Sequence, residues 1–208
     1  MSTKERCPRC AAPVREPSAW SSAWHCRVHG DVHPLRPAYR PSREGMAGLL
    51  RLAAVPVLVP WPLPAGWLVT GFAAAGDERT GGRACAVALT GPSPAGGPGD
   101  LVVVAEEPGV GLGAGLAGLA GPDPGDALTM ARPHALLHFE GHEIPLWHVA
   151  APDRAVYAGE LKGNWLWLVL WPPAAGLLLA EPIVLRDLRD PWQSLDLPFG
   201  APSPRLPC

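Results

Sequence analysis

The sequence predicts a mainly β protein of the α+β class. We expect a small N-terminal ribbon, followed by a predominantly antiparallel β domain with one or two short helices. Two observations lead to this fold class. Three cysteines and a histidine occur within the first thirty residues, in two pairs with the spacing of metal ligands. Beyond them, short apolar runs alternate with clusters of Gly and Pro, as strands alternate with turns.

The N-terminal motif has the spacing of a tetrahedral metal site. Cys7 and Cys10 form the first pair, and Cys26 and His29 form the second pair after a spacer of fifteen residues. Thiolate and imidazole ligands in this arrangement are typical of a Cys3His zinc site. His33 is the alternative to His29 as fourth ligand. A site with four protein ligands leaves no position for water, so the predicted Zn²⁺ is structural.

The residues around the ligands help to define the ribbon. Gly30 directly follows the second pair and can adopt the positive φ that such turns often need, whereas Ala11 after the first pair fits less well. His25 is a poorer ligand than His29, because adjacent residues of an extended segment point to opposite sides. We expect Trp20 and Trp24 to pack on one face of the ribbon.

The chain is expected to divide into three parts. Residues 1–36 form the zinc-ribbon module, residues 37–45 form a linker rich in helix and strand breakers, and residues 46–208 form a β-rich globular domain. Because the linker separates two cores, loss of a zinc ligand should loosen the ribbon and leave the main domain folded.

The clearest strand of the main domain is 164–171. Its tryptophans share one face and its leucines share the other, so a strand with two apolar faces should lie inside the domain. We expect a turn at 172–176 to let 177–185 pair with it. Other expected elements are a hairpin of 67–75 with 84–90, strands at 101–105, 143–149 and 154–160, a helix within 109–119, and a helix or strand at 46–54.

Composition and charge exclude several classes of protein. Of the 208 residues, 48% are hydrophobic and only 17% are charged, so the chain is not a disordered polar segment. Thiolate ligands and the lack of an apolar leader predict a cytoplasmic protein. The uncharged stretch 165–180 is too short to span a membrane, so no membrane insertion is expected. Residues 1–45 carry a net charge of +4 and the remainder −6. This asymmetry would let the ribbon touch nucleic acid or an acidic protein surface, but docking of the ribbon against the acidic body of its own chain, or incidental charge, explains it more simply.

Other chemical motifs are less specific. Gly113, Gly115 and Gly118 match G-x-G-x-x-G, but Gly121-Pro122 would stop the following helix too early for dinucleotide binding. A histidine group could form a metal or acid–base cluster, although a polar, solvent-facing strand explains it more simply. Possible cleft residues are Asp77, Glu106, His134, His138, Glu140, His142, Glu143 and His148. No catalytic residue is identified.

Six stretches of the chain resemble a family of uncharacterised actinobacterial proteins. The resemblance covers nearly the whole length and implies a cytoplasmic actinobacterial protein with an N-terminal zinc ribbon. It implies no activity, substrate or catalytic residue. The stretches that carry it are 7–10, 24–30, 59–67, 105–113, 121–125 and 145–148.

These observations lead to one principal functional hypothesis and two alternatives. The principal hypothesis is a non-enzymatic zinc-ribbon protein that binds a protein partner or has a regulatory role. The first alternative is an enzyme or small-molecule-binding protein that uses the β-rich domain. The second is weak, nonspecific nucleic-acid binding by the basic ribbon, because few aromatic residues are interleaved with its arginines to stack on bases.

Overall fold

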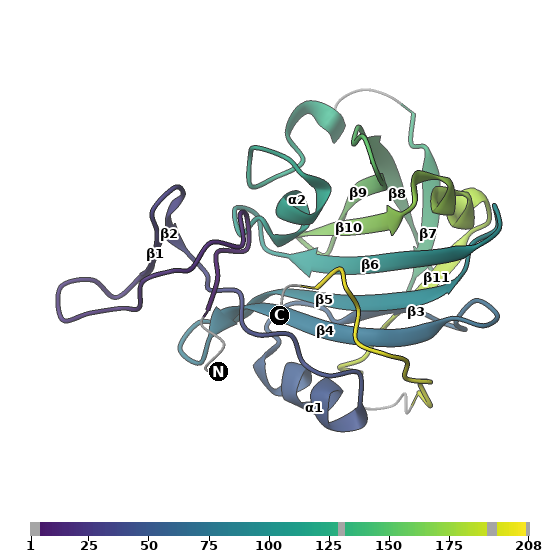
Figure 1. Cartoon of the computed structure of the whole chain (residues 1–208). Helices are drawn as coiled ribbons and strands as arrows, with labels where there is room; N and C mark the ends of the chain where they lie inside the picture. Colours follow the sequence, from purple (N-terminus) through teal and green to yellow (C-terminus); the bar gives the residue numbers. More distant parts are fainter. Residues whose placement is uncertain (1–4, 129–131, 191–194, 207–208) are drawn as a thin grey trace.

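A strongly curled sheet of nine strands forms the body of the molecule, and a small two-stranded arm projects from one side (Figure 1). The computed structural model describes residues 5–128, 132–190 and 195–206. The arm contains β1 (Trp24–Cys26) and β2 (Gly30–Val32). The strands of the large sheet are β3 (Leu58–Pro60), β4 (Leu68–Asp77), β5 (Gly81–Pro92), β6 (Pro98–Glu106), β7 (Ala135–Phe139), β8 (His142–Val149), β9 (Ala155–Leu161), β10 (Asn164–Trp171) and β11 (Ile183–Asp187).

The strand order in the large sheet is β3-β11-β7-β8-β9-β10-β6-β5-β4. All neighbours are antiparallel except β11 and β7, which run parallel. Helical segments are short: α1 (Arg43–Leu52), α2 (Leu112–Ala117) and the 3-10 segments Gly125–Leu128 and Pro173–Ala180. The prediction of a mainly β fold with antiparallel strands and short helices is therefore confirmed.

Strand β10 lies at the centre of the sheet, between β9 and β6, as its two apolar faces predicted. Its leucine face, with Leu168, points into a large core inside the curl, and its tryptophan face, with Trp167, belongs to a second core on the outer side. Both side chains are fully buried. The expected partner of this strand was wrong. Residues 173–180 form a 3-10 segment, and β11 pairs with β3 and β7 instead.

The outer core is covered by α2 and by part of the N-terminal region. Leu112 and Ala114 of α2 are buried against the tryptophan face of β10 and the neighbouring strands. Gly113 makes this close packing possible, because a Cβ at that position would overlap the indole ring of Trp167. Leu35, just after β2, is 2% exposed and belongs to the same core. The arm is thus attached to the side of the sheet on which α2 lies.

The last residue of the expected ribbon module and the start of the expected linker make backbone contacts with the sheet. Arg36 donates its N–H to the carbonyl of Ala74, and Tyr39 exchanges hydrogen bonds with Phe72, so this stretch runs along the outer edge of β4. Helix α1 begins at Arg43, within the expected linker range. Ser42 caps it by accepting a hydrogen bond from the Gly45 N–H.

Among the described residues, no helix is both long enough and apolar enough to cross a membrane. The stretch 165–180, considered in the sequence for that possibility, is divided between a sheet strand and a 3-10 segment.

Candidate metal centre

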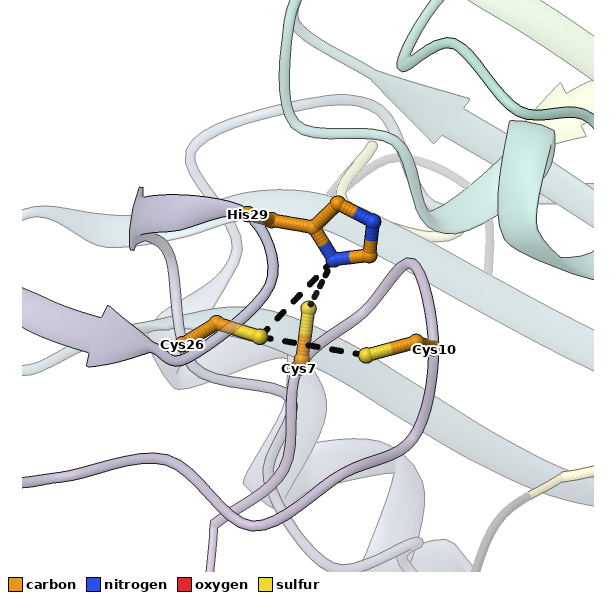
Figure 2. A group of neighbouring side chains, drawn as sticks. All are labelled: Cys7, Cys10, Cys26 and His29. Atoms are coloured by element: carbon orange, nitrogen blue, oxygen red, sulfur yellow. Dashed lines mark hydrogen bonds between the residues drawn. The ribbon is translucent and has the colours of Figure 1, made fainter.

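Two turns of the arm bring four potential metal ligands together. The ligand atoms of Cys7, Cys10, Cys26 and His29 all lie within 4.8 Å of one another. The Nδ1 atom of His29 is 3.3 Å from the Cys7 sulfur and 3.8 Å from the Cys26 sulfur, and the sulfurs of Cys10 and Cys26 are 3.8 Å apart. Figure 2 shows the three thiols and the imidazole pointing toward one another. This arrangement is able to hold a metal ion and is compatible with zinc.

Each ligand pair is closed by a turn with positive φ. Ala11 has a φ of 54° and donates its N–H to the Cys7 carbonyl, while Gly30 has a φ of 70° after the second pair. The sequence predicted this geometry for Gly30. At Ala11 the protein accepts a left-handed conformation that L-residues other than Gly adopt at a cost of about 1–2 kcal/mol. The side chain of Arg6 donates to the Ala11 carbonyl and helps to hold that turn.

The two rival histidines lie outside the group. His25 exchanges backbone hydrogen bonds with Arg15, and its Nδ1 atom is 3.2 Å from Asp31. His33 is half-buried near Asp77 and the ion pair between Arg83 and Glu107. His29 is therefore the histidine that the structure brings to the three cysteines.

The protonation equilibria of the ligands differ because their surroundings differ. Burial raises the pKa of the Cys7 thiol to about 12 when no cation is present. Burial also acts to raise the pKa of Cys26, but the backbone N–H groups of Val28 and His29, together with the neighbouring thiols, outweigh it and lower that pKa. Burial and the charge of Arg9 lower the pKa of His29, which keeps the imidazole neutral and its lone pair available for a metal.

The first turn is packed tightly against α2. Gly115 lies under this turn, where a Cβ would come within 2.6 Å of the Pro8 carbonyl oxygen. Arg9 extends across the same surface and donates its Nη2 to the carbonyl of Ala120 at 2.7 Å. Glycine is needed at position 115, because only glycine lets the backbones of α2 and of the first turn approach so closely.

A second set of contacts joins the arm to the turn between β4 and β5. The indole N–H of Trp24 donates to Asp77 at 3.1 Å, and Arg79 donates its Nη2 to the Ser22 carbonyl at 2.7 Å. Thr80 and the Arg79 N–H also donate to Asp77. These hydrogen bonds outweigh the effect of burial and lower the pKa of Asp77, so this carboxylate is a charged structural anchor.

The outer end of the arm, in contrast, is solvated. Residues 13–21, which we call the arm tip, fold back through a turn between Ser18 and Ser21. Trp20 in this turn has an exposed fraction of 96%. The expectation that Trp20 and Trp24 pack together on the ribbon was therefore wrong. Trp24 contacts the large sheet, and Trp20 contacts solvent.

The glycine-rich motif serves the packing of α2. The Glu106 carboxylate accepts hydrogen bonds from the N–H groups of Leu112 and Gly113, at 2.6 and 3.1 Å, at the start of that six-residue helix. Glu106 is fully buried, and burial raises its pKa to about 7 despite these two donors. An internal carboxylate thus already occupies the helix N–H groups that a phosphate would use in a dinucleotide site.

The other predicted cleft residues lie on or beside the β7–β8 hairpin, where His138 is paired with Glu143 and the rings of His134 and His148 are in contact. His138 and His142 lie on the β7–β8 hairpin, where Glu140 pairs with Lys162. His134 accepts the N–H of His148. Among the described residues, the four arm ligands form the only group with the geometry of a metal site. None of these histidines lines the two cavities that Asp77 borders.

Two adjoining cavities lie where the arm meets the sheet, and no sequence motif predicted them. Their volumes are about 330 and 380 Å³. Both are bordered by Trp24, Pro34, Asp77 and Arg79, and the larger also by His33. Burial and the charge of Arg83 lower the pKa of His33. The sequence singled out His33 only as a rival metal ligand.

Comparison with known proteins places the chain in one family. The model of a family of unknown function, DUF6758, matches residues 1–206. The chain belongs to this family. The resemblance inferred from the sequence stretches is thus confirmed at the level of an uncharacterised family that covers nearly the whole chain. No match to a curated protein or to a solved structure was found.

Proposed function

We propose that this DUF6758 protein is a non-enzymatic, cytoplasmic interaction protein of actinobacterial origin, in which a structural Zn²⁺ holds the arm in position for a protein partner. The observation that carries the proposal is Trp20, a large aromatic side chain that is 96% exposed at the outer end of the arm. Tryptophan is strongly enriched among residues that dominate the energy of protein interfaces. Because Trp20 is exposed on an arm whose other end would be held by the metal site, we expect it to contact the protein partner.

The choice of zinc rests on ligand chemistry. Three thiolates and one imidazole in a compact group suit Zn²⁺ in a closed tetrahedral site, and no position is left for a reacting water. Cys7, Cys10, Cys26 and His29 would be the ligands. The purified protein should contain one equivalent of zinc per chain, and His29→Ala should lose it. His33→Ala is the matched control and should keep it. Metal analysis that finds much less than one equivalent in the parent protein would contradict the zinc site.

The interaction is tested by in-cell crosslinking of the full chain, followed by mass spectrometry. We expect a protein partner to be captured by the parent and lost in Trp20→Ala. Leu177→Ala is the matched control, because Leu177 is another exposed apolar residue, 57% exposed, on the 3-10 segment after β10. The Trp20→Ala protein should retain its zinc and its melting temperature. Equal capture by the parent and by Trp20→Ala would refute the role of the arm tip.

The cavities at the arm–sheet junction favour small-molecule binding as a second candidate function. A pocket between two structural units, with an aromatic wall and a histidine of lowered pKa, is a common setting for ligand binding. Trp24 and His33 would form such a site. Mass spectrometry of the intact protein in native buffer should then find a co-purifying small molecule that His33→Ala loses. A parent protein that carries none, and whose melting temperature no metabolite mixture raises, would exclude this function.

A further inference from the structure

We propose that the partner presents an acidic, carboxylate-rich protein segment to a basic hollow on the arm, next to the site where Trp20 is bound. This inference rests on the proposed function and specifies the chemistry of the partner. The hollow has a volume of about 340 Å³ and is distinct from the metal centre and from the junction cavities. It is lined by Pro13, Val14, Arg15, His25 and Arg27.

The backbone pairing of the arm places the basic side chains on one face. Arg15 and His25 are directly opposite each other and exchange two backbone hydrogen bonds, at 2.9 and 3.0 Å. Side chains of directly opposed residues in an antiparallel pair lie on the same face. Arg27 lies in the turn that follows β1, and it lines the same hollow.

The two arginines are available for a ligand. Both are exposed, and within residues 5–128, 132–190 and 195–206 neither guanidinium forms a salt bridge. His25 already directs its Nδ1 atom to Asp31, so only its Nε2 atom can serve a ligand. Two guanidinium groups beside a concave surface are suited to carboxylates, because each can donate two parallel hydrogen bonds to one carboxylate.

The hollow and Trp20 are close enough to contact one partner segment. The turn at Ser18 and Ser21 begins three residues beyond Arg15, and an extended chain advances about 10 Å over three residues. A segment of a few residues would therefore reach from the hollow to Trp20. A tryptophan anchor flanked by arginines has the composition of an interface hot spot.

A protein segment fits this surface better than a nucleic-acid strand. Proteins that bind a single nucleic-acid strand stack several bases on aromatic side chains and make many contacts with phosphates. The arm offers Trp20 alone for stacking, since Trp24 is held against the sheet by its hydrogen bond to Asp77.

The test measures fluorescence anisotropy of a labelled synthetic peptide, rich in Glu and Asp around one central Leu, with the full zinc-loaded chain. We expect saturable binding that weakens at least about tenfold in the double variant Arg15→Glu, Arg27→Glu. The control is the double variant Arg51→Glu, Arg186→Glu. It changes the net charge of the protein by the same amount, but at positions on α1 and β11. That control should bind within about twofold of the parent.

Three results would overturn the inference. The first is the absence of saturable peptide binding. The second is an equal loss in the control, which would show a general charge effect. The third is tighter binding of an oligothymidine of the same length, which would identify a nucleic-acid surface. The proposed function fails separately, because it depends on whether Trp20→Ala loses a crosslinked partner and not on this peptide.

Discussion

The base and the tip of the arm belong to one short segment but differ in burial and in their contacts with the large sheet. The base, residues 5–12 and 26–36, contains the metal ligands and packs against α2 and β4 through Gly115, Arg9 and Leu35. The tip, residues 13–21, presents Trp20 almost entirely to solvent. The buried contacts and the potential metal ligands of the arm are therefore at its base, and an exposed tryptophan is at its tip.

This difference separates two roles within the arm. The metal ligands and the buried contacts have the features of a support, while the tip has those of a binding element. Substitutions in the base should therefore change stability, and substitutions in the tip should change binding with little effect on stability. Four predictions test whether the base and its supporting residues determine stability. They are given from the largest expected effect on stability to the smallest.

Replacing Trp167 should have the largest effect. Its fully buried indole lies directly under Gly113 of α2, the helix that carries the arm base. Trp167→Ala should lower the free energy of unfolding by about 3–5 kcal/mol, because it leaves a cavity in the outer core. We expect insoluble protein or a loosely packed state without sharp near-ultraviolet circular dichroism. A fully folded variant that has merely lost an interaction would show that our β-core architecture is wrong at its centre.

Loss of the metal should destabilise the base and, through α2, the sheet. Cys10→Ser should lose zinc, and a ligand present at about a thousand times its dissociation constant contributes about 4 kcal/mol. The large sheet should stay folded with a lower melting temperature, and amide exchange should increase in 5–36 and 112–117. Cys85→Ala, at a buried cysteine outside the metal group, is the control for zinc content. Exchange confined to 5–36 would show that residues 1–36 and 46–208 are independent units.

Glu106 should make the support sensitive to pH. Burial raises its pKa from 4.5 to about 7, so the folded protein keeps this proton at pH values where the unfolded chain has lost it. The free energy of unfolding must therefore fall as pH rises from about 4.5 through about 7. The stability of the parent relative to Glu106→Gln should be greater at pH 5 than at pH 8 by roughly 2.5 kcal/mol. Denaturant titrations at both pH values, made with zinc present, measure it. A difference independent of pH would show that the carboxyl titrates normally.

The smallest expected effect is at the first metal turn. Ala11 has a left-handed conformation with a φ of 54°, which glycine adopts without a steric penalty. Ala11→Gly should raise the free energy of unfolding by about 1 kcal/mol and leave the metal content unchanged. Gly30→Ala, at a φ of 70° in the second turn, is the reciprocal change and should lower stability by a similar amount. Equal melting temperatures for the two variants would contradict this account of the turns.

The sequence predicted best where local pattern determines structure. The ligand spacing indicated the metal group, and the alternating faces of 164–171 placed β10 inside the body. The hairpin of β4 and β5 followed from two apolar runs around a polar loop. In each case the interactions that fix the element join residues close together in the chain, or depend on an alternation visible in the residues themselves.

Prediction failed where distant segments decide the outcome. Nothing in residues 177–185 indicates that β11 pairs with β3 and runs parallel to β7. Trp20 and Trp24 look equivalent in the sequence, and only the position of Asp77 draws one of them to the sheet. Glu106 was noted as a possible cleft carboxylate, but its role under α2 depends on the curl of the sheet. Contacts between segments that are distant in the chain produce no periodic pattern in the local sequence.

The pairing of β3 with β11 has a consequence for synthesis on the ribosome. It joins residues 58–60 to residues 185–187, so the curled sheet is incomplete until residue 187 has left the exit tunnel. The potential metal ligands, in contrast, all lie within residues 7–29 and leave the tunnel long before that. Contacts between distant segments form slowly, whereas local ones form early. The four potential ligands can therefore come together on the nascent chain long before the sheet is complete, whereas the contacts of the arm with α2 and with the β4–β5 turn form only later.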